Sequence, residues 1–157
     1  MQVDVRVGEL GHPAAAKLIV ALDAEIRARY EDPIQGLVLD LGLAEVAPRL
    51  GAFALAWAGD DAVGCGAVRL IADDTAELKR MYVVPEYRRH GVASAILQFL
   101  ESQARSLGAS RIVLETVTSP PSARSLYQAF GYEQIDKFGQ YVESEISYCM
   151  GKILRPE

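Results

Sequence analysis

The stretch LKRMYVVPEYRRHGVA, residues 78–93, decides the fold. Its first part belongs to a run over residues 75–83 that is typical of a β-strand, and Pro85 cannot continue a paired strand. Apolar residues at helical spacing begin at Val92, so a basic turn containing Gly91 leads directly from the strand into a helix. The unpaired N–H groups and partial positive charge of a helix N-terminus favour a bound phosphate or pyrophosphate. We therefore predict an anion site at this junction.

Two widespread phosphate loops are absent from the chain. No Gly-x-x-x-x-Gly-Lys-Ser/Thr motif occurs, which argues against a nucleoside triphosphatase. No Gly-x-Gly-x-x-Gly motif follows the first predicted strand, which argues against a Rossmann dinucleotide site. The predicted anion site must therefore belong to another class of fold.

Hydrophobic periodicity and turn signals outside this stretch predict a mixture of strands and helices. A Gly-Asp-Asp turn at residues 59–61 separates two strands of a hairpin. Within residues 75–83, strict alternation would place Ala76, Leu78, Arg80 and Tyr82 on one face. We expect a loop with a short helix over residues 34–50, strands over 3–7, 53–58, 62–70, 75–83, 111–117, 132–135 and 146–153, and helices over 13–30, 92–107 and 120–130 with Ser119 as a cap. This order predicts an α/β fold with a mixed sheet and helices on its faces.

Length and composition narrow the class of protein. With 157 residues, 50% of them hydrophobic, the chain fits a single globular domain. The net charge of −5 disfavours nucleic-acid partners, and no apolar run is long enough to cross a membrane. The start of the chain does not read as a signal peptide, so we expect a cytoplasmic protein with reduced cysteines. The two cysteines and two histidines lack metal-ligand spacing, so we expect no metal.

Two motifs in the expected order resemble those of the GCN5-related N-acetyltransferases. The first is Arg-x-x-Gly-x-Ala at residues 88–93, which resembles the loop that binds the pyrophosphate of acetyl-CoA in that family. The second is Ala-x-x-Leu-Tyr at residues 123–127, followed by Gly-Tyr at 131–132. The resemblance implies a mostly antiparallel sheet of about six to seven strands, helices on both faces, and a splayed parallel pair formed by strands 75–83 and 111–117.

The resemblance also implies that acetyl-CoA is the co-substrate and that an N-acetyltransferase reaction takes place. Acetyl-CoA would lie between the splayed strands, with its pantetheine arm along the first of them and its pyrophosphate on the basic loop. The residues expected to bind it are Met81, Tyr82, Val83, Arg88, Arg89, His90, Gly91, Val92, Ala93 and Ser94.

Two residues are candidates for handling protons in the reaction. Tyr127 matches the tyrosine that lies beside the coenzyme sulfur in many relatives, where a neutral phenol can protonate the leaving thiolate. Glu77 matches a glutamate that acts as a base through water, and Glu115 is a rival for this role. The alternatives are that Tyr127 is a core aromatic residue and that Glu77 is an ordinary solvent-facing glutamate. We expect His90 to be a loop residue rather than a base.

The acceptor is less well defined by the sequence. Tyr30 and Tyr141 are candidates for the wall of its pocket, and the resemblance implies a small-molecule or peptide amine. Relatives often carry Asn or Gln where this chain has Pro120, so that amide contribution is absent or supplied by a neighbour. A non-catalytic acyl-CoA sensor of the same fold is the alternative function, and a homodimer is a family-level expectation.

Overall fold

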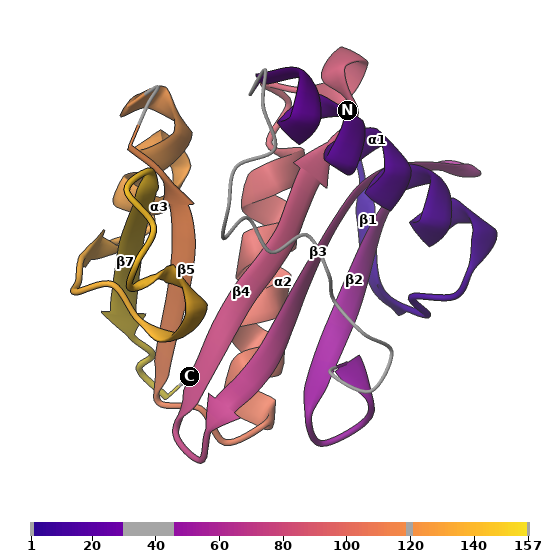
Figure 1. The fold of residues 1–157 in the computed structure, drawn as a ribbon. Coiled ribbons are helices and arrows are strands. Elements are labelled where there is room, and N and C mark those ends of the chain that lie inside the picture. Colours follow the sequence, from indigo (N-terminus) through magenta and orange to yellow (C-terminus); the bar gives the residue numbers. More distant parts are fainter. Residues whose placement is uncertain (1, 30–45, 119–120, 157) are drawn as a thin grey trace.

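The computed structural model describes residues 2–29, 46–118 and 121–156. Within them, seven strands form one sheet in the order β1-β2-β3-β4-β5-β7-β6 (Figure 1). The strands are β1 (Asp4–Gly8), β2 (Gly51–Ala58), β3 (Asp61–Ala72), β4 (Thr75–Val83), β5 (Arg111–Val117), β6 (Glu133–Gln134) and β7 (Ser147–Ile153). The helices are α1 (Pro13–Arg29), α2 (Val92–Ser106) and α3 (Ser125–Ala129), with short 3₁₀ turns η2 (Pro85–Tyr87), η3 (Pro121–Arg124) and η4 (Gly139–Tyr141).

The parallel contact between β4 and β5 determines the shape of the sheet. Among the described residues it is the one parallel pairing, and the other neighbours are antiparallel. It joins residues 75–78 of β4 to residues 111–114 of β5, although both strands continue further. Figure 1 shows β4 and β5 diverging beyond this contact. The predicted mixed sheet with a splayed parallel pair is therefore confirmed.

Helices cover both faces of the sheet, as predicted. Val92, Ile96 and Leu100 of α2 join a core cluster that includes Ile112 and Leu114 of β5. On the opposite face, Leu18 and Leu22 of α1 pack in a second cluster with residues of β2 and β3. Buried apolar side chains on both faces make the central strands continuously hydrophobic, which is why β2 and β3 contain long apolar runs.

The predicted alternation along β4 is wrong in its second half. Arg80 has a φ of 60°, and a β-bulge places Arg80 and Met81 opposite the single residue Gly66 of β3. A bulge adds one residue to a strand and so reverses the facing of the side chains that follow. As a result Met81, like Leu78, packs in the α2 cluster, whereas Tyr82 packs in the α1 cluster.

The segment after β5 also differs from the prediction. We expected one helix over residues 120–130, whereas the structure has a 3₁₀ turn at Pro121–Arg124 followed by the five-residue helix α3. Gly131, with a φ of 89°, ends the segment as predicted. Ser119, Pro120 and the predicted loop at residues 34–45 lie outside the described residues.

Two further findings concern the cysteines and the helices. Cys65 and Cys149 are free and buried, and β4 and β5 separate their strands in the sheet. No helix of the described chain is long and apolar enough to cross a membrane.

Candidate active site

A pocket of about 410 Å³ opens where β4 and β5 diverge. Its wall combines the end of β4, the loop that follows, the first turn of α2, and parts of α1 and α3. The lining residues are Leu22, Glu25, Ile26, Met81, Tyr82, Val83, Tyr87, Arg88, Arg89, Gly91, Val92, Ala93, Ser94, Leu126 and Tyr127. The two sequence motifs, about 30 residues apart, thus contribute to one cavity.

The basic loop presents backbone N–H groups to this pocket. Arg89 and Gly91 both have left-handed backbones, with φ of 64° and 80°, which directs the chain sharply into α2. The first helical hydrogen bond runs from the N–H of Ala95 to the carbonyl of Gly91, so the N–H groups of residues 92–94 have no partner within the helix. A β-carbon on Gly91 would meet open space, so the positive φ is what requires glycine there. The loop has the geometry of an anion site.

Arg88 ties the loop to the rest of the site. Its Nε donates to the carbonyl of Val83 at 2.8 Å, and its Nη2 donates to Oε2 of Glu25 at 2.7 Å. Its guanidinium also lies 5.6 Å from the centre of the Tyr82 ring. Because the carboxylate of Glu25 offsets the charge of Arg88, this arginine holds the loop in place against β4 and α1. An amide of a ligand that reached the Val83 carbonyl would share it with Arg88.

Tyr127 lies on the wall of the pocket, in α3. Burial, together with the negative charge of Glu115, raises the pKa of Tyr127 to about 12. Its ring meets the ring of Tyr132 edge to face at 5.8 Å between centres, which fixes its direction. A phenol with a raised pKa stays protonated at neutral pH and can donate a proton or a hydrogen bond. Its ring packs at the edge of the core and its place on the wall leaves it available to a ligand.

Glu77 lies in a buried hydrogen-bonded group on the face of the sheet opposite α2. Only 1% of Glu77 is exposed, so the solvent-facing alternative is wrong. Its Oε1 accepts from Arg69, at 3.0 Å from Nε and 2.9 Å from Nη2, and its Oε2 accepts from the hydroxyl of Tyr141 at 2.7 Å. Burial and the charge of Glu77 raise the pKa of Tyr141. Neither Glu77 nor Tyr141 is part of the pocket wall described above.

Glu115, on the neighbouring strand β5, interacts electrostatically with both Glu77 and Tyr127. Burial raises the pKa of Glu115, the nearby charge of Glu77 raises it further, and a hydrogen bond from Ser147 opposes the shift. The hydroxyl of Ser147 donates to Oε2 of Glu115 at 2.7 Å. Glu115 therefore senses Glu77 and also acts on Tyr127.

The structure brings together most of the residues predicted for the coenzyme. All of them line the pocket except His90, which is exposed on the loop. Tyr141 lies instead beside Glu77, and Tyr30 lies outside the described residues. Within the described part of the chain, no group of three or more His, Cys, Asp or Glu side chains is placed to hold a metal ion.

Sequence reasoning missed the ionic contacts that α1 makes with β4 and the loop. Glu25 pairs with Arg88, and Asp23 pairs with Arg80 at 2.6 Å. Arg69 of β3, which holds Glu77, was also missed. Asp23 and Glu25 are visible in the sequence as acidic residues of a helix. Their spacing gives no indication of their partners, which lie more than 50 residues away in the chain.

Comparisons with known proteins agree with this arrangement. The model of the acetyltransferase (GNAT) family matches residues 19–132. The chain is 37% identical over 101 residues to the uncharacterized N-acetyltransferase YsnE of Bacillus subtilis, which covers 63% of this chain and 67% of YsnE.

Solved structures share the fold over nearly the full chain. A Klebsiella pneumoniae protein assigned as an acyl-CoA N-acyltransferase superposes with a TM-score of 0.83 and 26% identity, covering 98% of this chain and 99% of that one. A GNAT acetyltransferase from Elizabethkingia anophelis, solved with acetyl-CoA bound, superposes with a TM-score of 0.72 over 97% of this chain and 98% of that one, at 17% identity. The chain belongs to the GNAT family, and it is an N-acetyltransferase.

Proposed function

We propose that the chain transfers the acetyl group of acetyl-CoA directly to a primary amine of a small molecule or peptide. The observation that carries this proposal is that one pocket joins the anion-binding start of α2 to the phenol of Tyr127. The start of α2 suits a pyrophosphate, and the phenol of Tyr127 suits a group that develops negative charge during the reaction. A related fold from Elizabethkingia anophelis holds acetyl-CoA.

The residues of the pocket fit the parts of acetyl-CoA. Arg89 and the N–H groups of residues 91–94 would hold the pyrophosphate, because they combine positive charge with free donors. Among the described residues, the edge of β4 that faces β5 has no strand partner beyond Leu78, so the backbone of Met81 and Val83 would meet the pantetheine amides there. The coenzyme supplies an acetyl thioester whose carbonyl carbon the amine attacks.

The transfer requires two proton movements, which we assign to different residues. The new bond joins the amine nitrogen to the acetyl carbon, and the bond that breaks joins that carbon to sulfur. The amine must lose a proton and the departing thiolate must gain one. Tyr127 is the donor to the sulfur, since its raised pKa keeps the phenol protonated at neutral pH and its O–H available to the departing thiolate.

Glu77 takes the proton of the amine through an intermediary. Its oxygens accept from Arg69 and from Tyr141, and its burial keeps the substrate from reaching it directly. The hydroxyl oxygen of Tyr141 accepts from the side-chain amide of Gln140 at 3.2 Å, and its second lone pair remains as an acceptor while its proton points to Glu77. A proton from the amine, or from a water beside it, can therefore enter at Tyr141 as another passes to Glu77.

Tyr127→Phe tests the proposal. Steady-state release of coenzyme A thiol from acetyl-CoA is measured over a panel of amines, with coenzyme binding measured by calorimetry. We expect kcat to fall by about 10²-fold or more, as for loss of a general acid, with an unchanged Kd for acetyl-CoA. Tyr148→Phe is the matched control, because Tyr148 lies outside the pocket with Arg124 over its ring. Absence of acetyl-CoA binding by the wild-type protein would refute the proposal.

A further inference from the structure

A second pocket, of about 560 Å³, lies at the other end of α2. The coenzyme pocket contains the first turn of this helix and the second pocket contains Arg105 of its last turn. A helix of 15 residues at about 1.5 Å per residue separates the two by roughly 20 Å. The second pocket is lined by Arg105, Arg111, Phe130, Gly131, Glu133, Ile135, Gly151, Lys152, Ile153 and Arg155.

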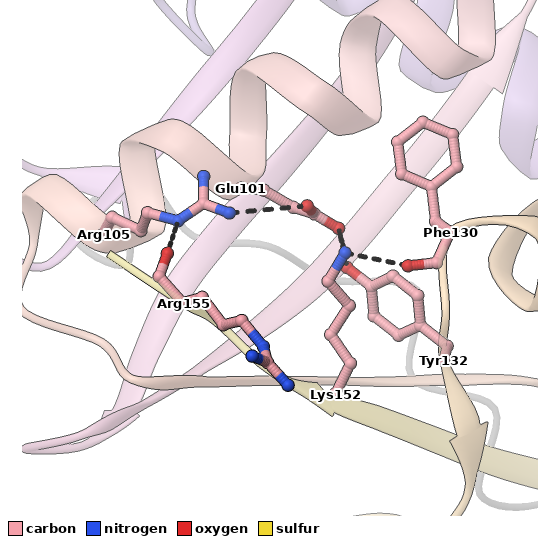
Figure 2. A network of polar contacts seen from close by, with 6 residues as sticks. All are labelled: Glu101, Arg105, Phe130, Tyr132, Lys152 and Arg155. Atoms are coloured by element: carbon pink, nitrogen blue, oxygen red, sulfur yellow. Dashed lines mark hydrogen bonds and ion pairs between the residues drawn. The ribbon is translucent and has the colours of Figure 1, made fainter. Parts of the chain in front are cut away.

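A buried carboxylate organises two of the cations on this wall (Figure 2). Glu101, 5% exposed, accepts from the hydroxyl of Tyr132 at 2.8 Å and pairs with Nζ of Lys152 at 3.0 Å and with Arg105 at 4.0 Å. Lys152 also donates to the carbonyl of Phe130 at 2.8 Å. These contacts hold Lys152 in one position, so its charge is already in place at the pocket wall. Figure 2 shows both cations converging on Glu101.

Two further guanidinium groups line the same pocket. The carbonyl of Arg155 accepts from Nε of Arg105 at 2.8 Å, which fixes the backbone there. The side chains of Arg111 and Arg155 make no hydrogen bond or ion pair with any residue in the described ranges, and both residues are exposed. An arginine that lines a pocket without an acceptor keeps its planar set of donors available for an oxyanion.

The charges do not balance within this pocket. Its wall carries four cationic side chains, against which stand the carboxylates of Glu133 on the wall and Glu101 behind it. Counted over the described residues, the excess is two positive charges, in a chain whose net charge is −5. A phosphate group carries about −1.5 to −2 at neutral pH and accepts paired hydrogen bonds from arginine. The volume is within the range of small-molecule sites, roughly 300–1,000 Å³.

We propose that this second pocket binds a phosphate group, with Arg111 and Arg155 as its direct contacts and Lys152 as a fixed charge behind them. The phosphate can be the free anion or the ester of a small organic molecule. In the second case, Phe130, Ile135 and Ile153 would meet the organic part, because they form the apolar portion of the wall. The site is separate from the coenzyme loop and does not depend on the proposed acceptor.

The test measures phosphate binding with the coenzyme loop already occupied. Inorganic phosphate is titrated against chloride at constant ionic strength, in saturating coenzyme A, while the backbone amides of Gly131 and Gly151 are followed by NMR. We expect a saturable shift of these two resonances in the wild-type protein. Arg111→Ala/Arg155→Ala should weaken the apparent affinity at least tenfold without changing the affinity for coenzyme A.

The control removes the same charge elsewhere. Arg6→Ala/Arg27→Ala replaces two exposed arginines outside the pocket and should leave the titration unchanged. Titration with phenyl phosphate distinguishes the sources: tighter binding identifies an organic ester, and equal binding identifies the free anion. The proposal is overturned if phosphate acts no differently from chloride, if the Arg111/Arg155 variant still responds, or if the response vanishes once coenzyme A is bound.

Discussion

The hydroxyl of Tyr141 donates a 2.7 Å hydrogen bond to Oε2 of Glu77, across 64 residues of sequence and from a 3₁₀ turn to the centre of a sheet. Arg69 occupies the other oxygen of the same carboxylate. The carboxylate is thus oriented at both oxygens, by Arg69 at Oε1 and by Tyr141 at Oε2. The two residues, expected separately as base and substrate wall, act as one unit in the structure.

This unit predicts strong coupling between the two side chains. Tyr141→Phe leaves Oε2 of a buried carboxylate without its donor, which should cost about 1.5–3 kcal/mol of the free energy of unfolding. Glu77→Gln removes the negative charge to which the hydroxyl of Tyr141 donates its hydrogen bond. The double variant should be more stable than the sum of the single effects predicts, by about 1 kcal/mol or more. Urea unfolding of all four proteins measures this coupling, and strict additivity would contradict it.

The left-handed backbone of Gly91 predicts a selective loss of coenzyme binding. Gly91→Ala meets no steric obstacle but forces alanine into a φ of 80°, at a cost of about 1–2 kcal/mol. Relaxation of that strain would redirect the amides of residues 92–94, so we expect Kd for acetyl-CoA to rise several-fold. Gly108→Ala is the matched control, because it has a φ of 96°, open space and a position at the far end of α2. The Gly108→Ala variant should lose a similar free energy of unfolding, and calorimetry should show an unchanged Kd for acetyl-CoA.

The raised pKa of Tyr127 predicts a change of stability at alkaline pH. The folded protein keeps this proton until about pH 12, whereas an unfolded tyrosine releases it near 10. The folded state therefore binds more protons between these values, and stability is lost as pH rises through the window. We expect the free energy of unfolding to fall more steeply above pH 10 in the wild type than in Tyr127→Phe. The difference in absorbance at 295 nm between the two folded proteins should titrate near pH 12. A midpoint near 10 would show that the phenol is not buried as described.

The ion pair between Asp23 and Arg80 predicts a large effect on stability. The pair joins α1 to the bulge of β4 at 2.6 Å, and the side chain of Arg80 is only 5% exposed. Among the described residues, its Nε is one of the buried nitrogens without a hydrogen-bond partner, so loss of Asp23 leaves a buried guanidinium poorly satisfied. Asp23→Ala should cost about 3–5 kcal/mol.

An exposed pair provides the comparison for this prediction. Arg6 and Asp4 lie 3.0 Å apart with 58% and 71% of their side chains exposed. Asp4→Ala should cost less than about 1 kcal/mol, because water solvates both charges. Thermal unfolding at equal pH and salt measures both effects, and costs of similar size would contradict the assignment of Asp23 to a buried pair.

Elements whose signals are local could be predicted well from the sequence. The bounds expected for β4 and β5 are those of the structure, and α2 ends one residue earlier than expected. The turn at Gly59 was also predicted from a local signal, since glycine takes the positive φ that a two-residue hairpin needs. In these segments periodicity and turn chemistry indicate the same structure that tertiary packing selects.

The features that escaped prediction depend on contacts between distant segments. Arg80 of β4 carries no turn signal, and its side chain pairs with Asp23 of α1, 57 residues away, so the bulge could not be predicted from alternation. The burial of Glu77 depends on Arg69 and Tyr141, which arrive from a neighbouring strand and from the C-terminal region. Predicting where the site residues lie therefore required the resemblance to a family as well as the local pattern.

The position of β7 between β5 and β6 has a consequence for synthesis on the ribosome. β5 pairs with β4 over four residue pairs alone, whereas β7 pairs with it along seven. While the chain emerges, β5 and the α3 segment behind it lack this larger partner until β7 leaves the exit tunnel. Domains assemble from the N-terminus as they are made, at about 5–20 residues per second. The half of the coenzyme pocket that carries Tyr127 is thus completed last, so a nascent chain forms the half with the basic loop before it can turn over acetyl-CoA.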